Sequence, residues 1–383
     1  MTKQIFLAPF FKLILAICLL LGGGISGAHA ADYKLEPIVK GLDLPWGIAF
    51  LPDGSFLVTE LAGTLHHIYP HASANQISAP IKGVPEVYYS GQGGLMDIVL
   101  HPDYESNNLV YLSLAVGTDD ANTLQIIRGR YTGKALEDVK VIFEAAPKRN
   151  TPVHYGGRMT FMADNSLLIT VGEGFNYREE AQNPYTHLGS IVRVGDDGAV
   201  PKDNPYYDSE MALPEIWSYG HRNAQGILYD SVTRTIFQSE HGAKGGDELN
   251  IIEAGNNYGW PAITLGQDYN SAQISPYTYY EGMEQPIHHW TPSIAPSGMA
   301  LYRGDAFPAW RGDIFVTSLT FNKVVRVDMA GKKGQKVKGE SDIFTEIGER
   351  LRDIRVGRDG LLYILSEGHE RHPGGKIWRV SPQ

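Results

Sequence analysis

The chain of 383 residues lacks several features that would place it in common protein classes. Its one cysteine, Cys18, lies in an N-terminal segment expected to be removed, so neither disulfides nor thiol chemistry is expected in the mature protein. No long amphipathic helical pattern is present. Lysine and arginine total 33 against 43 acidic residues, a net charge of -10, which argues against nucleic acid and anionic membranes as partners.

Apolar residues form a run from Leu13 to Leu21 near the N-terminus. Lys3 and Lys12 precede this run, and the small-x-small sequence Ala28-His29-Ala30 follows it. This order predicts a secretory signal peptide over residues 1–30, cleaved near Ala30-Ala31, and a periplasmic or secreted protein. The run is too short to span a bilayer comfortably, so we expect no membrane span in the mature chain.

An apolar strand, a short turn and a second β-rich strand recur six times along the chain. The first strands of the six copies begin at Gly47, Gly94, Gly157, Gly226, Gly298 and Ile354. The 43 glycines and 21 tyrosines suit tight turns and short, closely packed strands. Because a repeated hairpin unit indicates radial repetition, we predict that residues 31–383 form a single all-β domain, a six-bladed β-propeller.

Polar residues gather at the start of the first strand in three of these copies. They are Gln92, His154 and the pair Arg222-Asn223. In a propeller the innermost strand of each blade lines the central axis, so equivalent positions in different blades meet. We therefore expect these side chains to form one site, although they are far apart in sequence.

His154 and Arg222 are the candidates for chemistry within this group. Histidine is suited to accept a proton near neutral pH, and the alternative for His154 is a structural hydrogen bond to a neighbouring blade. Arg222, if buried near the axis, needs an anionic partner because an unpaired guanidinium is costly there. Its own motif offers no obvious acid, which favours an anionic ligand or a developing oxyanion over a salt bridge to a distant carboxylate.

Two further segments carry charged groups. Ser239 to Asn250 combines glycines with carboxylates, a mixture that suits calcium, although a solvated acidic loop would look similar. In Glu349 to Asp353, strand alternation places Arg350 and Arg352 on one face. If this face points inward, the two positive charges require a ligand with several negative charges. If the face is solvated, the two arginines indicate no ligand.

Taken in order, these motifs resemble the soluble glucose/sorbosone dehydrogenases. The resemblance is closest to the periplasmic aldose sugar dehydrogenases that use pyrroloquinoline quinone (PQQ), and it covers the chain from about Leu35 to Val380. The motifs that carry it are Gly91–Gly94, His154–Arg158, Gly220–Gly226, Glu240–Gly242 with Asp247–Asn250, and Arg350–Asp353.

The resemblance implies an aldose dehydrogenase with PQQ and calcium at the top of the central channel. His154 would remove the proton of the sugar C1 hydroxyl while hydride passes to PQQ and a lactone forms, and Arg222 would stabilise charge on the quinone oxygen. The implied cofactor contacts are Gln92, Arg222, Asn223, Tyr269, Ser318, Thr320, Arg350 and Arg352. The implied calcium contacts are the carbonyls of Gly242 and Ala243, with Glu248 and Tyr258 at a second position. The electron acceptor is not identified.

Two positions depart from the family pattern. Val153 stands where some glucose-oxidising members carry an acid, and Thr320 stands where members commonly place a lysine on the cofactor. Lys323 replaces that lysine only if its loop bends inward. Two other functions stay open: a calcium-dependent propeller hydrolase of the lactonase type, which would need several carboxylates around the axis, and a non-catalytic sugar-binding propeller, which loss of the lysine would favour.

Overall fold

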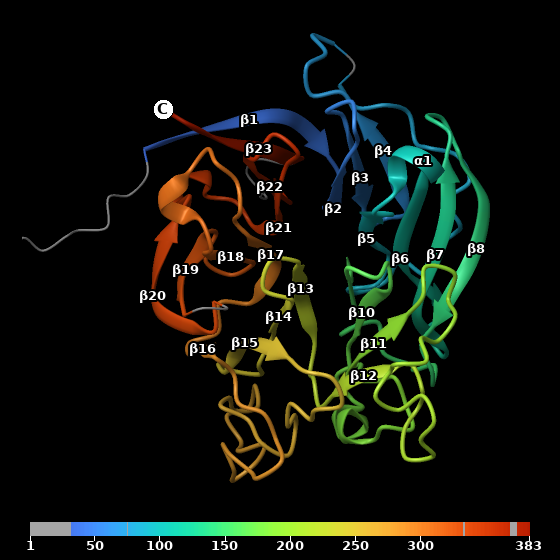
Figure 1. The fold of residues 1–383 in the computed structure, drawn as a ribbon, viewed down its shortest axis with the longest axis vertical. Helices are drawn as coiled ribbons and strands as arrows, with labels where there is room; N and C mark the ends of the chain where they lie inside the picture. The colour runs from blue at the N-terminus through green and yellow to red at the C-terminus, as the bar shows by residue number, and fades with distance from the viewer. Residues whose placement is uncertain (1–31, 75, 332–333, 368–373) are drawn as a thin grey trace, which may run out of the picture.

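Six small antiparallel sheets are arranged in a ring around a central axis (Figure 1). The computed structural model describes residues 32–74, 76–331, 334–367 and 374–383, so the predicted signal peptide lies outside the described residues. The predicted six-bladed β-propeller is confirmed. Among the described residues, no helix is long and apolar enough to cross a membrane.

Each blade is a sheet whose strands run outward from the axis in chain order, except that β1 (Tyr33–Leu42) is the outermost strand of blade 6. Blade 1 contains β2 (Pro45–Phe50), β3 (Phe56–Glu60) and β4 (Thr64–Ile68). Blade 2 contains β5 (Leu95–Leu100), β6 (Leu109–Gly117), β7 (Asn122–Tyr131) and β8 (Leu136–Glu144). Blade 3 contains β9 (Gly156–Phe161), β10 (Leu167–Val171), β11 (Ser190–Val194) and β12 (Ile216–Tyr219).

The other three blades follow the same plan. Blade 4 contains β13 (Ala224–Asp230), β14 (Thr235–Glu240), β15 (Asp247–Ile252) and β16 (His288–Trp290). Blade 5 contains β17 (Pro296–Leu301), β18 (Ile314–Ser318), β19 (Val324–Ala330) and β20 (Lys336–Ile343). Blade 6 contains β21 (Leu351–Val356), β22 (Leu362–Ser366), β23 (Gly375–Pro382) and β1 (Tyr33–Leu42). The short helices are α1 (Tyr104–Asn107), η1 (Arg178–Gln182), η2 (Pro308–Trp310) and η3 (Thr345–Ile347).

The ring closes because the first strand of the chain completes the last blade. β1 pairs antiparallel with β23, from Tyr33 opposite Pro382 to Leu42 opposite Gly375 (Figure 1). The ends of the chain are therefore held together by a full ladder of backbone hydrogen bonds. This pairing makes β1 the outermost strand of blade 6, so the two ends of the chain close the ring within one sheet.

Glycine at the start of the inner strands permits the close approach that the ring needs. A Cβ atom on Gly298 would lie 2.2 Å from the Asp353 carboxylate of the next inner strand, and one on Gly226 would lie 2.9 Å from the Cβ of Met299. Both distances are too short for any larger residue unless a strand moves. The repeated glycine thus reflects packing of inner strands against one another, while apolar side chains such as Leu124 and Ile169 fill the space between blades.

A buried cluster of two arginines and two aspartates crosses the axis near the middle of the channel. Arg158 Nη1 lies 3.0 Å from Asp353 Oδ1 and 3.6 Å from Asp97 Oδ1. Arg355 also contacts both acids, with Nε 2.9 Å from Asp353 Oδ2. The cluster joins β5, β9 and β21, three inner strands from blades 2, 3 and 6. Each charge is paired, as burial requires.

We expect Asp353→Asn to lower the free energy of unfolding by about 3–5 kcal/mol, because removing one member of a buried ion cluster leaves an uncompensated charge. Urea unfolding of the two proteins measures this. Glu105→Gln is the matched control, since Glu105 pairs with Arg358 at the surface, where the two side chains are 67% and 56% exposed. It should change stability far less. Equal effects of the two substitutions would contradict the bracing role of the cluster.

Candidate active site

The starts of the inner strands surround a cavity of about 290 Å³ at one mouth of the channel. Four of the predicted cofactor contacts line it, namely Gln92, Asn223, Arg350 and Arg352. Trp46, His241, Leu319 and Glu367 line it as well. The convergence expected from the repeat is therefore found in the structure.

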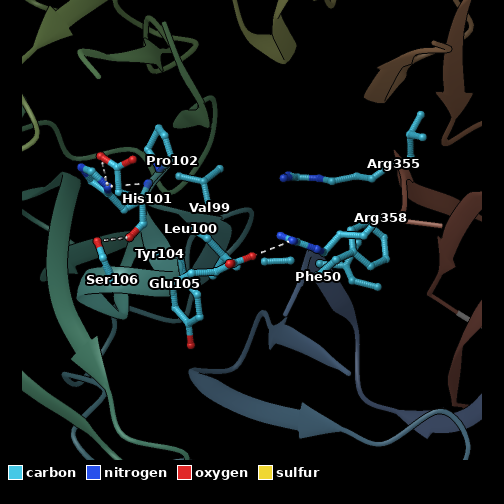
Figure 2. Close-up of a pocket in the computed structure, with 14 residues that line it drawn as sticks. Phe50, Val99, Leu100, His101, Pro102, Tyr104, Glu105, Ser106, Arg355 and Arg358 are labelled. Atoms are coloured by element: carbon cyan, nitrogen blue, oxygen red, sulfur yellow. Dashed lines mark hydrogen bonds and ion pairs between the residues drawn. The ribbon is translucent and has the colours of Figure 1, made fainter. Parts of the chain in front are cut away.

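The ends of the inner strands surround the opposite mouth of the channel. Two cavities of about 510 and 550 Å³ lie there, and Figure 2 shows the first, which the surface ion pair of Glu105 and Arg358 crosses. None of the predicted catalytic or cofactor-binding residues lines either cavity. The four-residue ion cluster lies between this mouth and the smaller cavity, because Arg158 lines the former and packs against Trp46 of the latter, 4.0 Å from its ring centroid.

His154 lies just before β9, next to Tyr155 and Gly156, which line the smaller cavity. His154, Arg222 and Tyr269 are not themselves among its lining residues. The His154 backbone N–H donates to Gln92 Oε1 at 2.8 Å, and its Nδ1 lies 3.1 Å from Glu173 Oε1. This contact favours the tautomer that carries the proton on Nδ1. His154 Nε2 then keeps its lone pair, and it has no hydrogen-bond partner among the described residues. The arrangement is that of a base held by a carboxylate.

Burial lowers the pKa of His154 below its usual value of 6.5. The carboxylate of Glu173 opposes this shift, whereas the positive charges of Arg222 and Arg149 add to it. Because the net direction is downward, His154 is neutral at neutral pH and able to accept a proton. Its backbone also has a φ of +52°, a left-handed conformation that is uncommon for a residue with a side chain and often marks a functional position.

Arg222 lies just before β13, buried and without an ion-pair partner among the described residues. Its Nη1 donates to the carbonyl of Gly242, and its Nη2 lies 3.4 Å from the Tyr269 hydroxyl. The enclosed Nε has no hydrogen-bond partner in the described part of the chain. Within the described ranges, Arg222 thus does not form the salt bridge to a distant carboxylate that the sequence left open. Its buried positive charge still requires an anionic partner.

Arg350 and Arg352 point into the cavity, but they share an acid that sequence analysis did not identify. Arg350 Nε and Arg352 Nε lie 2.5 and 2.6 Å from the two carboxylate oxygens of Glu367. Burial alone would raise the pKa of Glu367, but the two arginines hold it below its usual value. The three residues together keep one net positive charge beside the cavity.

Glu173, Glu240 and Glu367 are functional residues that the sequence analysis missed, and they share one structural position. Each lies at the end of the second strand of its blade or within two residues after it, and binds a group just before the inner strand of that blade. Glu240, for example, accepts hydrogen bonds from His221 Nδ1 and from the Arg222 backbone N–H. Glu60 occupies the same place in blade 1 and accepts from the Asp43 N–H. The recurrence of glutamate after four second strands was a signal available in the sequence.

The remaining cofactor candidates lie around this core. Asn223 Oδ1 accepts from the Gly156 N–H at 3.2 Å, which joins blades 3 and 4. Tyr269 is 57% exposed at the mouth of the cavity, where its ring stacks near Phe175 at a centroid distance of 6.2 Å. Gln92 is fixed through the His154 backbone, as described above.

The segment expected to carry the lysine of the family is placed differently. Ser318 is fully buried, and its hydroxyl donates to the Ile294 carbonyl, while Thr320 is exposed in the following turn. Leu319 is the residue of this turn that lines the cavity. Lys323 does not bend inward, because its Nζ lies 2.8 Å from Asp342 Oδ1 of the outer strand β20. The structure thus does not bring Ser318 or Thr320 to the cavity wall.

The loop predicted to bind calcium folds against a neighbouring segment. Gly242 N–H donates to Asp247 Oδ1 at 2.8 Å, and Lys244 pairs through its backbone with Gln267. Among the described residues, no group of three or more His, Cys, Asp or Glu side chains could hold a metal. A cation at Gly242 and Ala243 would therefore depend on backbone carbonyls, which are calcium ligands, and on oxygens supplied by a ligand.

Glu248 and Tyr258, assigned to a second calcium position, lie in the interior of blade 4. Glu248 is paired across the strands with Glu240, and its carboxylate accepts from Asn250 Nδ2 at 3.1 Å. Burial and the charge of Glu240 raise the pKa of Glu248 to about 8. The Tyr258 ring stacks on His221, and its hydroxyl donates to the Ile251 carbonyl, so any contact of this residue with a cation would come from its own backbone carbonyl.

Comparison with known proteins agrees with this architecture. The family model for glucose/sorbosone dehydrogenase matches residues 42–379. The chain is 38% identical to aldose sugar dehydrogenase YliI of Escherichia coli K12 over 379 residues, which cover 97% of this chain and 98% of that protein.

Solved structures give the same result. The apo-form of the soluble aldose sugar dehydrogenase of Escherichia coli matches with a TM-score of 0.85 and 37% identity, covering 92% of this chain and 100% of that one. The PQQ-bound form of aldose sugar dehydrogenase from Streptomyces coelicolor matches with a TM-score of 0.75 and 26% identity, covering 92% and 99%. The matching family model and the aligned proteins belong to one class, the glucose and aldose sugar dehydrogenases. The chain belongs to the glucose/sorbosone dehydrogenase family, as predicted, and is an oxidoreductase.

The pair of Glu240 and Glu248 predicts a pH-dependent stability. Because the folded pKa of Glu248 is raised to about 8, the unfolded chain releases this proton first, and stability falls as pH rises from about 4.5 toward 8. In calcium-free buffer, Glu248→Gln should remove this slope and make the protein more stable than wild type at pH 7.5. Urea unfolding at pH 5 and 7.5 measures both effects. Glu281→Gln, at an exposed position, is the control; a slope that persists in Glu248→Gln would assign the titration to another group.

Proposed function

We propose that this protein is a periplasmic PQQ-dependent dehydrogenase that oxidises aldose sugars at C1 to lactones. The observation that carries the proposal is the placement of His154, with its lone pair free, beside Arg222, whose charge has no ion-pair partner among the described residues. Family membership and the PQQ-bound structure of the relative from Streptomyces coelicolor support the choice of cofactor. The predicted signal peptide supports the location.

The cavity suits a flat, multi-anionic group such as PQQ, which is a tricarboxylate. Arg222 has an enclosed Nε without a partner, and Arg350 and Arg352 share one acid between them. These groups would bind the carboxylate and quinone oxygens of PQQ, with Asn223 and Gln92 as amide contacts. When bound, PQQ would supply the two-electron acceptor that no amino-acid side chain provides.

In the proposed reaction His154 Nε2 takes the proton from the C1 hydroxyl of the sugar. Glu173 holds the Nδ1 proton, fixes the ring orientation and stabilises the imidazolium that forms. Phe175, whose ring lies edge-on to His154 at a centroid distance of 5.2 Å, covers the imidazole and limits access of water. The chain thereby supplies a positioned base, and Arg222 supplies a positive charge next to it.

The hydrolase alternative requires several carboxylates facing the axis to hold a catalytic metal. Among the residues that line the cavity, Glu367 is the one carboxylate, and two arginines neutralise it. This composition favours anion binding and proton transfer over metal-activated hydrolysis. No lysine is among the residues that line the cavity, which favours the alternative of a non-catalytic sugar-binding propeller. Measurements of sugar turnover distinguish this alternative from the proposed dehydrogenase.

The first test concerns the base. We expect His154→Ala to retain PQQ binding and to lower kcat for glucose by about 10²–10⁴-fold, the usual contribution of a positioned base. In wild type, kcat should be constant at neutral pH and fall only below a pKa that is under 6.5, because the base must be neutral. Glu173→Gln should move this acidic limb to lower pH, since the group that raises the His154 pKa is lost. Near wild-type turnover of His154→Ala would make this histidine structural.

The second test concerns the cofactor and its metal. We expect the purified apoprotein to bind PQQ with calcium and much more weakly with a chelator, because a divalent cation at the Gly242 and Ala243 carbonyls would neutralise part of the charge of the tricarboxylate. The absorbance of PQQ, titrated in both buffers, gives the two dissociation constants. Arg222→Met should weaken binding in the calcium buffer. Equal affinity for PQQ with and without the chelator would show that calcium is not part of the cofactor site.

A further inference from the structure

A second hollow lies next to the mouth of the catalytic cavity and has no role in the reaction described above. It has a volume of about 420 Å³ and lies between η1 (Arg178–Gln182) and the long connection from β15 to β16. We call it the tyrosine groove, because Tyr277 and Tyr280 line it with their rings 6.2 Å apart, and each is 56% exposed. Neither hydroxyl has a hydrogen-bond partner among the described residues.

The tyrosine groove is continuous with the catalytic mouth through two contacts. Arg178 lines the groove and forms an ion pair with Asp268 at 3.3 Å, and Asp268 is followed by Tyr269, which lies over Arg222. On the other side, Trp260 packs with Ile274 of the groove and also lies 5.2 Å below the Arg222 guanidinium. The groove and the residues around Arg222 are therefore neighbours in the structure.

The chemistry of the tyrosine groove matches that of a sugar ring. Exposed tyrosine faces stack on the C–H face of a pyranose while their hydroxyls stay available for hydrogen bonds. At the opposite wall, Glu179 offers a carboxylate and Arg178 a guanidinium that is paired with Asp268. The Gln182 amide of this wall is already bonded to Asn257 and to the Trp260 carbonyl. Glu179 is exposed and makes no hydrogen bond or ion pair with the other described residues. A ligand that carries hydroxyls can bind this carboxylate, whereas a purely apolar partner cannot.

We propose that the tyrosine groove is a distal saccharide subsite that binds the sugar units following the reducing end of an oligosaccharide, while the reducing end lies at His154. The proposal rests on the sugar-oxidising function proposed above. Binding energy from units remote from C1 would then raise kcat/KM for oligosaccharides over glucose. A protein partner that docks on the same tyrosines is the competing occupant, and the test separates the two.

The test compares the Tyr277→Ala/Tyr280→Ala double variant with wild type. Truncation of two stacking rings should lower kcat/KM of the reconstituted enzyme for α-1,4- and β-1,4-linked glucose trisaccharides by about 5–20-fold and leave glucose unchanged. Tyr279→Ala is the matched control, because Tyr279 belongs to the same loop and is 65% exposed but does not line the groove. The Tyr277→Phe/Tyr280→Phe variant, which keeps the rings, should retain most of the wild-type preference.

A binding measurement keeps the groove separate from the proposed reaction. Calorimetric titration of the apoprotein with the two trisaccharides needs neither PQQ nor turnover. It therefore tests whether the groove binds a saccharide even if no sugar is oxidised. Ala262→Arg, at an exposed position on the groove wall, fills the groove without touching the core and should abolish this binding. The proposal is overturned if wild type binds neither trisaccharide, or if the double alanine variant and Ala262→Arg bind them as wild type does. Loss of glucose and trisaccharide turnover in equal proportion would also overturn it.

Discussion

The buried cluster of Arg158, Arg355, Asp97 and Asp353 is the interaction on which the rest of the structure depends. It ties inner strands of blades 2, 3 and 6 together across the axis. Arg158 also donates to the carbonyls of Gln225 and Arg352 at 2.9 and 3.1 Å, and both residues line the catalytic cavity. The floor of the cavity is therefore held by charge pairing that tolerates little displacement.

Above this floor the same glutamate position recurs in several blades, but its binding partner differs. A glutamate at the end of a second strand binds whatever group precedes the inner strand of the same blade. In blade 3 the group is His154, and the result is an oriented base. In blade 4 the glutamate binds His221 and the Arg222 backbone, and the Arg222 side chain has no ion pair with any residue that the structure describes. In blade 6 two arginines share one acid. The balance leaves positive charge at the cavity, which is what an anionic ligand requires.

The sequence predicted the architecture well, because the hairpin repeat and its glycines follow from local geometry. It also brought Gln92, Asn223, Arg350 and Arg352 together correctly, since equivalent strand positions meet in a ring. It did not reveal the partners of the charged groups. Asp97 and Asp353 are neighbours only because the ring closes, and Glu367 looks like an ordinary turn residue until blade 6 is assembled. The placement of Leu319 rather than Thr320 at the cavity depends on one residue of register in a turn, which no pattern fixes.

The Gly242 carbonyl shows how the apoprotein and a loaded site must differ. In the structure it accepts a hydrogen bond from Arg222 Nη1, and that bond partly satisfies a guanidinium that has no acid. A metal cation at the same carbonyl would compete for its lone pairs and repel the arginine. Arg222 would then have to turn toward another acceptor, and a bound anion beside it would provide one. Binding of metal and anion should therefore be mutually favourable, because each relieves the cost that the other alone would impose.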